Sequence, residues 1–430
     1  MLNKIIKYLL YFLVFLLPLQ TRWIIRQGIT EYKMISLYLT DIALIFLLVL
    51  FAISKFKIQN YNFNQNSKFK IQNLFLFIAG LDLMIFISIF FASDKLIAIQ
   101  YYLRFLLGVG LFWLITCANY NKIKLIYFFL AGIFLQACLG IWQFLTQSTF
   151  SNKWLGIAEH NAGDLGVSVI ETISGERWLR AYGGLDHPNV FGGVLVIGIL
   201  LLVVKLFCYS KNKLLITHYS LLITFLSALF FTFSRSSWLA LIAGIITMLV
   251  IAIIKKDLFA QKKILQIILI SGILFFILFN LFSDLVLTRI SNNTRLENKS
   301  NIERLSSYSE SLDVIKDNWI FGVGAGNYVS GIMNNELRIK DGRLNNYKQP
   351  VHNVFLLIFA EIGVFGLLFF ILIPLFIIHN SLFKGDFNIK ISLLLALSVI
   401  SIFDHWFWSL HFGILLFWFV LVLILKIDED

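Results

Sequence analysis

The chain has 430 residues, of which 59% are hydrophobic and 14% are charged, and its mean hydropathy is +0.83. No soluble domain of this length tolerates that composition, because one core cannot bury so much apolar surface. The formal net charge of +12 invites a nucleic-acid partner, but the layout of the charges between the apolar runs argues against one.

Apolar runs of about 18–22 residues recur along the whole chain, and each is long enough to cross a bilayer. We count about twelve and predict an all-α integral membrane protein with a single polytopic domain over residues 1–430. No small-residue cleavage site follows the first run, so we expect a retained span and not a signal peptide. The runs are Lys4–Gln20, Ile35–Ser54, Leu74–Ala92, Leu96–Ala118, Ile123–Thr146, Asn189–Phe207, Leu214–Phe233, Ser236–Ile254, Ile264–Phe282, Asn353–His379, Ile391–Trp408 and Leu410–Lys426.

The lysines and the arginines lie on different sides of this predicted topology. With both termini in the cytoplasm, every short inner loop is basic, as the positive-inside rule requires. All of these charges are lysines, whereas every arginine lies on the outer side or within a span. Because arginine offers a bidentate fork to phosphate or carboxylate, the separation indicates an anionic ligand outside. The inner lysines are Lys4, Lys7, Lys55, Lys57, Lys68, Lys70, Lys122, Lys124, Lys205, Lys211, Lys213, Lys255, Lys256, Lys262, Lys263, Lys384, Lys390 and Lys426.

Several polar residues fall inside the predicted spans. Asp82 and Arg104 lie roughly 12 Å or more inside the hydrocarbon region, in successive spans. Intramembrane charges are usually paired or functional, so we expect an Asp82–Arg104 pair. Gln136 and Gln143 share one face of the fifth span, where we expect hydrogen bonds between helices. The three cysteines indicate neither a disulfide nor a metal site.

Two outer segments are long, 147–188 and 283–351, and loops of this length are usually functional. Arg180 comes late in the first segment. Pro188 suits the first turn of the next helix, which puts His187 at the mouth of that helix. A solvated loop charge is the plainer alternative for Arg180.

Arg235 follows Ser234 at a point where two spans meet outside with almost no loop. Ser234 can cap the eighth span, so Arg235 lies at a helix N-terminus. Free amides, the positive helix end and a guanidinium together make an anion site. The alternative is an interfacial anchor that extends along the membrane surface.

The second outer segment contains hydrophobic residues at helical spacing within 306–319, which predicts a helix on or near the membrane surface. A Gly-rich run, 322–326, follows. No Gly-Lys-Ser/Thr comes after it, so we expect a turn that lets the loop re-enter and not a nucleotide site. In the last outer turn, His405 beside Asp404 is a weaker candidate.

His352-Asn353, nine residues, Gly363, two residues and Gly366 place a titratable imidazole at one edge of the lipid. In a continuous helix the step from His352 to Gly363 is about 1,100°, or three turns plus about 20°, and Gly366 falls within roughly 40° of the same line. We therefore expect one face with histidine at the rim above a smooth glycine groove, which would let a neighbouring helix pack closely. Packing alone, with an interfacial histidine, is the alternative. Glu361 lies on the opposite face, where we expect polar groups of a neighbouring helix.

These segments resemble the bacterial O-antigen ligase and O-antigen polymerase superfamily. Their order is preserved over nearly the whole chain, and the predicted span number, the inner termini and the large loop before the histidine also fit. The matching stretches are Arg180-Ala181-Tyr182-Gly183 with His187-Pro188-Asn189, Phe233-Ser234-Arg235-Ser236 with Leu239, Phe321–Tyr328, and His352-Asn353 with Gly363 and Gly366.

The resemblance implies a glycosyltransferase of the bacterial plasma (inner) membrane that serves lipopolysaccharide or cell-envelope biosynthesis. Such an enzyme moves a glycan from an undecaprenyl-diphosphate carrier to a hydroxyl of a saccharide, lipid or protein acceptor on the outer face. The donor's polyprenyl tail would lie among membrane lipids, and no nucleic acid takes part.

The same resemblance implies roles for the candidate residues. Arg180 and Arg235 would stabilise charge on the diphosphate leaving group. His352 would accept the acceptor's proton, since a histidine ordinarily titrates at about pH 6.5. No cofactor is expected, and the outer side has no Asp-x-Asp cluster for a metal, so we expect a metal-independent, inverting displacement. The supporting residues would be His187, Asn353, Gly363, Gly366 and Arg104.

A polytopic transporter of a small anion or solute is the alternative from another class. It predicts charged residues along a path through the midplane, to which Asp82 and Arg104 could belong. It also predicts repeat symmetry and broken helices, and we expect neither from the sequence. The glycan, the acceptor, the choice between ligase, polymerase and protein glycosyltransferase, and the oligomeric state stay open.

Overall fold

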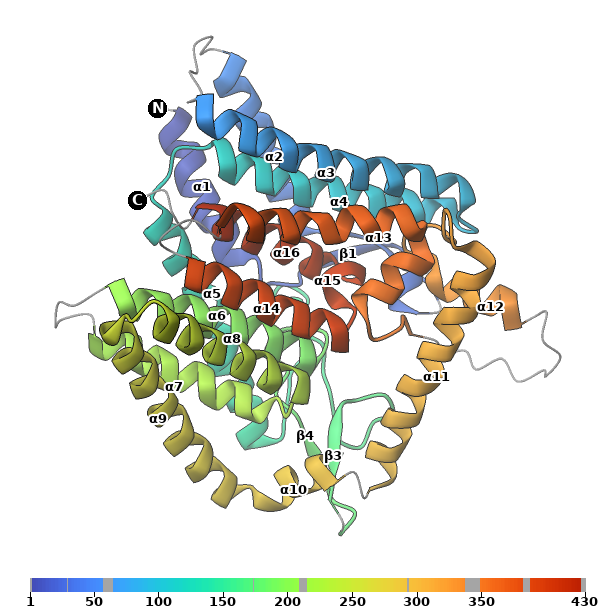
Figure 1. Cartoon of the computed structure of the whole chain (residues 1–430). Helices are drawn as coiled ribbons and strands as arrows, with labels where there is room; N and C mark the ends of the chain where they lie inside the picture. Colours follow the sequence, from blue (N-terminus) through green and yellow to red (C-terminus); the bar gives the residue numbers. More distant parts are fainter. Residues whose placement is uncertain are drawn as a thin grey trace.

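The computed structural model is a bundle of long helices (Figure 1). It describes residues 2–28, 30–56, 65–172, 174–208, 215–291, 294–336, 349–381 and 387–426. The predicted inner loops at 57–64, 209–214 and 382–386 lie outside the described residues. The side chains of Lys55, Lys68, Lys70 and Lys205 are not described either. Part of the large outer segment, 337–348, lies outside the described residues as well.

Each predicted apolar run contains a helix, because a backbone in lipid must satisfy its own hydrogen bonds. Among the described residues, six helices are long and apolar enough to cross a membrane, and five more are apolar but shorter. The chain is therefore a helical membrane protein, while the number of spans stays a prediction. The helices of the bundle are α1 (Leu2–Leu16), α2 (Leu39–Phe56), α3 (Gln65–Phe91), α4 (Lys95–Cys117), α5 (Lys122–Thr146), α6 (Pro188–Cys208), α7 (Leu215–Phe231), α8 (Arg235–Ile254), α9 (Leu258–Leu281), α13 (Val354–Ser381), α14 (Phe387–Phe403) and α16 (His411–Lys426).

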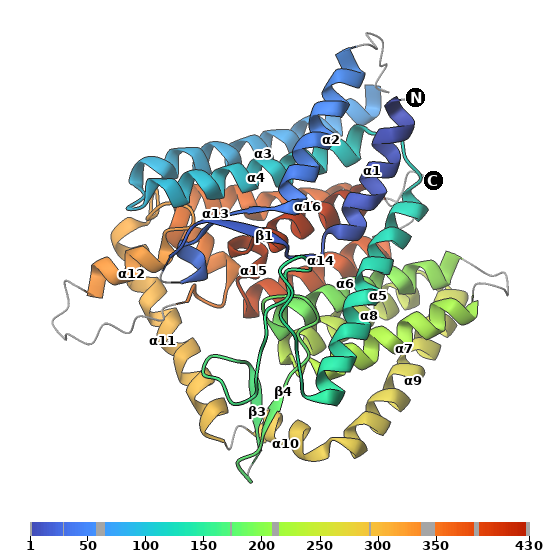
Figure 2. The same ribbon diagram turned by 180° about the vertical axis from the view of Figure 1, so that it is seen from behind.

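The two ends of the bundle differ. Both chain termini lie at one end, and the segments predicted to be outer gather at the other (Figures 1 and 2). Three helices there are α10 (Ser283–Ser291), α11 (Arg295–Asn318) and α12 (Tyr328–Glu336), and α15 (Trp406–Ser409) is a single turn. Helix α11 confirms the predicted helix at 306–319 and extends it toward the N-terminus.

Two antiparallel hairpins add to the helices and were not predicted. Strands β1 (Arg22–Arg26) and β2 (Ile35–Tyr38) pair with each other around the short 3-10 helix η1 (Glu31–Lys33). Strands β3 (Val169–Glu171) and β4 (Arg177–Leu179) pair in the first outer segment. The second apolar run consequently becomes helical only at Leu39, because its first residues belong to β2.

The expected pair between Asp82 and Arg104 does not form. Asp82 Oδ2 accepts a hydrogen bond from the hydroxyl of Tyr102 at 3.5 Å. Arg104 donates to the carbonyl of Ser36 at 3.2 Å, and its guanidinium lies 5.3 Å from the ring centre of Tyr38. The prediction is wrong because the hairpin of β1 and β2 supplies the partners of Arg104.

Helix α13 is broken at Gly363, whose φ of 74° and ψ of −175° are not helical. Gly363 and Gly366 therefore do not share one continuous helical face with His352, and that prediction is wrong. The physical reason is a loop, 319–324, that enters the break. The amide of Val364 donates to Trp319 O at 2.9 Å, and the loop's own amides donate to carbonyls of the preceding turn.

The Gly-rich run, 322–326, overlaps this loop and folds back against α13, while its re-entry into the membrane stays a prediction. The amides of Val323 and Gly324 donate to the carbonyls of Ala360 and Glu361, each at 2.9 Å. The carboxylate of Glu361 accepts from Trp408 Nε1 at 2.8 Å, which is the polar neighbour expected for it. A helix break whose backbone groups are bonded in this way is compatible with a membrane interior.

We predict that Gly363→Ala destabilises the protein. A Cβ at Gly363 would overlap the carbonyl of Ile320, and the positive φ is costly for any other residue. The free energy of unfolding should fall by about 2 kcal/mol or more. The matched control is Gly272→Ala in α9, where a Cβ meets nothing within 4 Å. Equal melting temperatures of the two purified variants in detergent would contradict this account of the break.

Candidate functional site

The segment that carries Arg180 is held against α5 by two buried glutamines. Gln143 accepts from the amide of Tyr182 at 3.1 Å and donates to the carbonyl of Gly183 at 2.8 Å. Gln136 accepts from the amide of Gly184 at 2.5 Å. The prediction that these glutamines bond to another helix is wrong, since their partners are the backbone of the first outer segment.

Arg180 is buried, with 3% of its surface exposed. Its Nε donates to the carbonyl of Thr232 at 2.7 Å, Nη1 to Ser168 Oγ at 2.6 Å, and Nη2 to Asn189 Oδ1 at 2.9 Å. The guanidinium is thus held in one orientation and joins the first outer segment, the turn between α7 and α8, and the start of α6.

Arg235 is the first residue of α8, as predicted, but Ser234 does not cap that helix through its side chain. The Ser234 hydroxyl lies 3.2 Å from that of Ser236 and accepts from Ser237 Oγ at 2.9 Å. The turn before it is sharp, because the buried residue Phe233 has a φ of 46°. The Arg235 side chain is 27% exposed, so the turn presents a guanidinium that solvent can reach.

A buried ion pair lies beside Arg235. Arg289 pairs with Glu297, and both side chains are almost fully buried. Arg289 Nε donates to the carbonyl of Phe233 at 3.1 Å, while Arg235 Nη1 donates to the carbonyl of Arg289 at 3.2 Å. Arg235 Nη2 is 3.4 Å from Glu297 Oε2. Sequence reasoning missed this pair, because neither residue belongs to a recognisable motif.

We call Arg180, Arg235, Arg289, Arg304 and Glu297 the arginine cluster. Burial, and then the like charge of Arg289, lower the pKa of Arg180, with a further contribution from Arg304. These side chains therefore feel one another's charge. With four guanidinium groups and one carboxylate, the cluster is cationic, and it lies at the end of the bundle where the segments predicted to be outer gather.

His352 is positioned by its neighbour in the sequence. Asn353 Oδ1 accepts from the amides of Phe355 at 2.9 Å and Leu356 at 3.0 Å, which makes Asn353 the N-cap of α13. Its Nδ2 donates to the carbonyl of Ile402 in α14 at 3.2 Å. The supporting role expected of Asn353 thus has a geometric basis, since it fixes His352 beside the end of α14.

The carboxylate next to His352 is Asp404, directly after α14. His352 Nδ1 lies 3.6 Å from Asp404 Oδ1, and Asp404 Oδ2 accepts from Asn189 Nδ2 at 3.0 Å. Burial alone would raise the pKa of Asp404, but the neighbouring His352 holds that pKa far below its ordinary value. Asp404 is therefore a carboxylate at neutral pH.

A chain of contacts consequently runs from Arg180 through Asn189 and Asp404 to His352. It joins the arginine cluster to the histidine, although the four residues come from separate parts of the sequence. His352 itself is 24% exposed, so a substrate can reach its ring.

Two further histidines surround Asp404, and both are neutral. Burial, followed by the charge of Arg180, lowers the pKa of His187 well below its ordinary value. Its Nδ1 accepts from the amide of Asn189 at 3.1 Å, which a neutral ring allows. Burial lowers the pKa of His405 to about 3. The His405 ring lies 5.1 Å from that of His352, centre to centre.

The same residues form a candidate metal group. His352, Asp404 and His405 each offer one ligand atom, and these atoms all lie within 4.8 Å of one another. Two imidazoles and a carboxylate are donors that Zn²⁺ accepts. The prediction that no metal takes part rests on the missing Asp-x-Asp cluster, so it needs an experiment with a chelator.

The fold and the site together define a multi-pass helical membrane protein with a cationic site and a histidine–carboxylate pair at one end of its bundle. Residues 220–371 match the family model described as O-Antigen ligase. The match includes Arg235, the Arg289–Glu297 pair and His352, and it supports the expected resemblance to the O-antigen ligase superfamily. Arg180 and Asp404 lie outside the matched residues. No curated protein matches the chain.

We predict that Glu297→Ala destabilises the fold, because it leaves Arg289 buried without its carboxylate. Removing one partner of a buried ion pair costs about 3–5 kcal/mol. The matched control on the same helix is Glu303→Ala, whose pair with Lys299 is exposed at both side chains and should contribute less than about 1 kcal/mol. Thermal unfolding in detergent measures both, and equal effects would refute the buried pair's role.

Proposed function

We propose that this protein is a membrane glycosyltransferase of the O-antigen ligase or polymerase type. It transfers a glycan from undecaprenyl diphosphate to a hydroxyl acceptor on the outer face of the bacterial inner membrane. The observation that carries the proposal is the chain of contacts from Arg180 to His352, because it joins an anion site to a candidate base. The family match at residues 220–371 supports an enzyme of this general type.

The arginine cluster is suited to stabilise the diphosphate leaving group. Negative charge builds on the diphosphate as the glycosidic bond breaks, and fixed guanidinium groups stabilise that charge without reorganising. Arg235 is partly exposed at a helix N-terminus, which favours direct contact with the diphosphate. Arg180 is buried and three of its nitrogens are bonded to protein, which favours a fixed positive charge that also positions Asn189.

His352 is suited to act as the general base. The Asp404 carboxylate faces Nδ1 of His352 and favours a proton there, which leaves Nε2 free to accept one. The acceptor oxygen attacks the anomeric carbon and loses its proton to His352, while the bond from that carbon to the diphosphate oxygen breaks. The displacement inverts the anomeric carbon and releases undecaprenyl diphosphate.

The transporter alternative has less support. Its charged path through the midplane rested on Asp82 and Arg104, which bond to different partners. The break in α13 is a feature that transporters share, but here the loop at 319–324 fills it.

We expect Arg235→Lys to lower transfer, because lysine cannot offer two parallel hydrogen bonds to a diphosphate. The loss should be roughly tenfold or more for the charge-assisted bonds involved. Arg180→Lys should lose activity to a similar degree through its bond to Asn189. The control is Arg295→Lys, whose side chain is 78% exposed. The measurement is transfer from a purified undecaprenyl-diphosphate-linked oligosaccharide to host membranes, at equal protein levels, and full activity of both variants would refute the assignment.

We expect His352→Ala to fold and insert normally yet lose transfer by about 10²–10⁴-fold, as for the loss of a general base. The control is His379→Ala at the other end of the same helix, an exposed residue. A packing role for His352 would instead lower the protein level and leave the specific activity unchanged.

The same assay with EDTA separates the base from a metal site. The wild type should keep its turnover in the presence of the chelator. If EDTA abolishes transfer and Zn²⁺ restores it, then His352, Asp404 and His405 hold a metal ion, and the proposed metal-free mechanism is wrong.

A further inference from the structure

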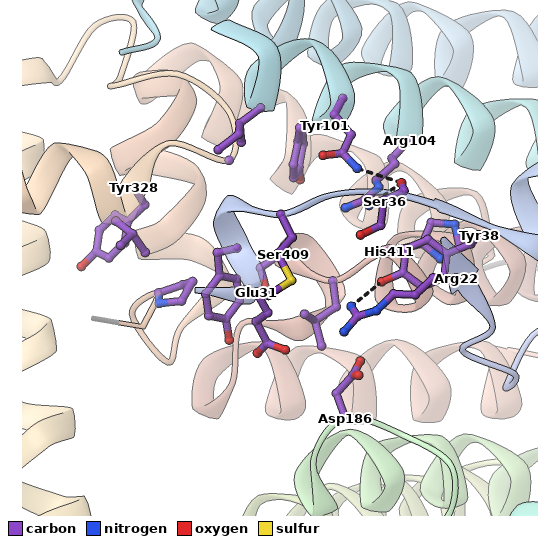
Figure 3. Close-up of a pocket in the computed structure, with 18 of the residues that line it drawn as sticks. Arg22, Glu31, Ser36, Tyr38, Tyr101, Arg104, Asp186, Tyr328, Ser409 and His411 are labelled. Atoms are coloured by element: carbon purple, nitrogen blue, oxygen red, sulfur yellow. Dashed lines mark hydrogen bonds between the residues drawn. The ribbon is translucent and has the colours of Figure 1, made fainter. Parts of the chain in front are cut away.

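A polar pocket lies beside the site, between the hairpin of β1 and β2, helix α4 and the start of α16 (Figure 3). None of its lining residues belongs to the arginine cluster. Two arginines, Arg22 and Arg104, line it together with three acidic side chains, Glu31, Asp186 and Glu361. Because the acidic side chains outnumber the arginines, the pocket does not suit a simple anion such as a diphosphate.

Aromatic rings also line the pocket, among them Tyr38, Tyr101 and Tyr328. The Tyr38 ring stacks on His411 with ring centres 3.9 Å apart, and its hydroxyl accepts from Arg22 Nη1 at 3.2 Å. Rigid rings beside fixed donors and acceptors suit a ligand that has both an apolar face and many hydroxyls. A sugar ring has both, since its C–H groups cover an aromatic face while each hydroxyl donates and accepts.

One donor in the pocket has no partner among the residues that the structure describes. Arg104 uses Nη2 to bind the carbonyl of Ser36, but its buried Nε makes no hydrogen bond. A buried N–H without an acceptor is costly, and a ligand hydroxyl would satisfy it. Gln100 beside it also donates to Ser36 O, at 2.9 Å, so its amide oxygen lies in a fixed position on the pocket wall.

The pocket reaches the catalytic histidine through short contacts. Ser409 lines it, and the Ser409 hydroxyl lies 2.6 Å from His405 Nδ1. Tyr32 lines it as well, with its ring centre 5.7 Å from that of His405. The His405 ring in turn lies beside that of His352. Pro350 extends the wall to within two residues of His352.

The arginine cluster is connected to the His352–Asp404 pair by a different route. Asp186 lies within electrostatic reach of Arg22 and His411 in the pocket. Its neighbour His187 instead lies within reach of Arg180 and Arg289. Printed contacts connect the His352–Asp404 pair to the arginine cluster through Asn189 and to the mixed, aromatic pocket through His405, because His405 contacts Ser409 in the pocket wall.

We propose that this pocket binds the terminal sugar ring of the acceptor and presents one of its hydroxyls to His352. The inference rests on the proposed transferase function. It names the acceptor as a saccharide, and it assigns the hydrogen-bonding contacts to Arg22, Arg104 and Tyr38.

The test is saturation-transfer NMR on the full chain in lipid nanodiscs. The probes are glucose, galactose, N-acetylglucosamine and glucuronate, each added alone. The wild type should bind at least one of them, and Arg22→Gln or Arg104→Gln should raise its Kd roughly tenfold or more. The matched control is Arg26→Gln on the same strand, because Arg26 pairs with Asp94 outside the pocket. If Arg104→Gln does not fold, the Kd of the Tyr38→Phe variant for the sugar decides the test, because that substitution removes only one hydroxyl.

Two outcomes overturn the inference: no sugar binds the wild type, or the pocket variants bind as the wild type does. Competition by an undecaprenyl-diphosphate-linked oligosaccharide would assign the pocket to the donor's sugar and refute the acceptor role. Arg235→Lys and His352→Ala should keep sugar binding while they lose transfer. If the wild type binds sugars but transfers nothing, the proposed function fails alone; if transfer works and the pocket variants support it fully, the pocket inference fails alone.

Discussion

The buried carboxylate of Asp404 is the group on which the arrangement of the site depends. A charge with 5% exposure is tolerated only where hydrogen bonds and opposite charges surround it. Asn189 from α6, His352 from the start of α13 and the amide of His405 supply these partners. Three segments that are distant in sequence must therefore meet at one point, and that requirement fixes where His352 lies.

The arginine cluster is built around a second buried acid in the same way. Glu297 neutralises Arg289, and the carbonyls of Phe233 and Arg289 accept the remaining donors. Arg180 belongs to both arrangements, since it contributes charge to the cluster and a hydrogen bond to Asn189. One arginine thus couples the geometry of the arginine cluster to the position of Asp404 beside His352, although it is too buried to suit direct contact with a ligand.

The break in α13 shows how a loop is held at the mouth of a membrane bundle. Gly363 gives up the helical conformation, and the loop at 319–324 takes over the hydrogen bonds that the helix would have made. Loop and helix are thereby joined, and Tyr328 comes to lie beside Glu361. The Glu361 carboxylate accepts a hydrogen bond from the backbone amide of Tyr328 at 3.4 Å. A glycine that looked like a packing surface in the sequence is instead the hinge that admits the loop.

The sequence by itself determined the apolar runs, the helical class, the resemblance to the O-antigen ligase superfamily, and the candidates Arg180, Arg235 and His352, because hydrophobic length and local motifs are properties of short stretches of chain. It also pointed to the helix within 306–319. Tertiary structure alone decided the partners: Asp404 for His352, Glu297 for Arg289, the β2 backbone for Arg104, and loop amides for the two glutamines of α5. Those choices depend on which segments meet in space, and a buried polar group takes whichever complementary group the packing brings within hydrogen-bonding distance. The pocket beside His352 has the same origin, since its walls come from the first hairpin, α4 and the last helix, which no spacing within the sequence connects.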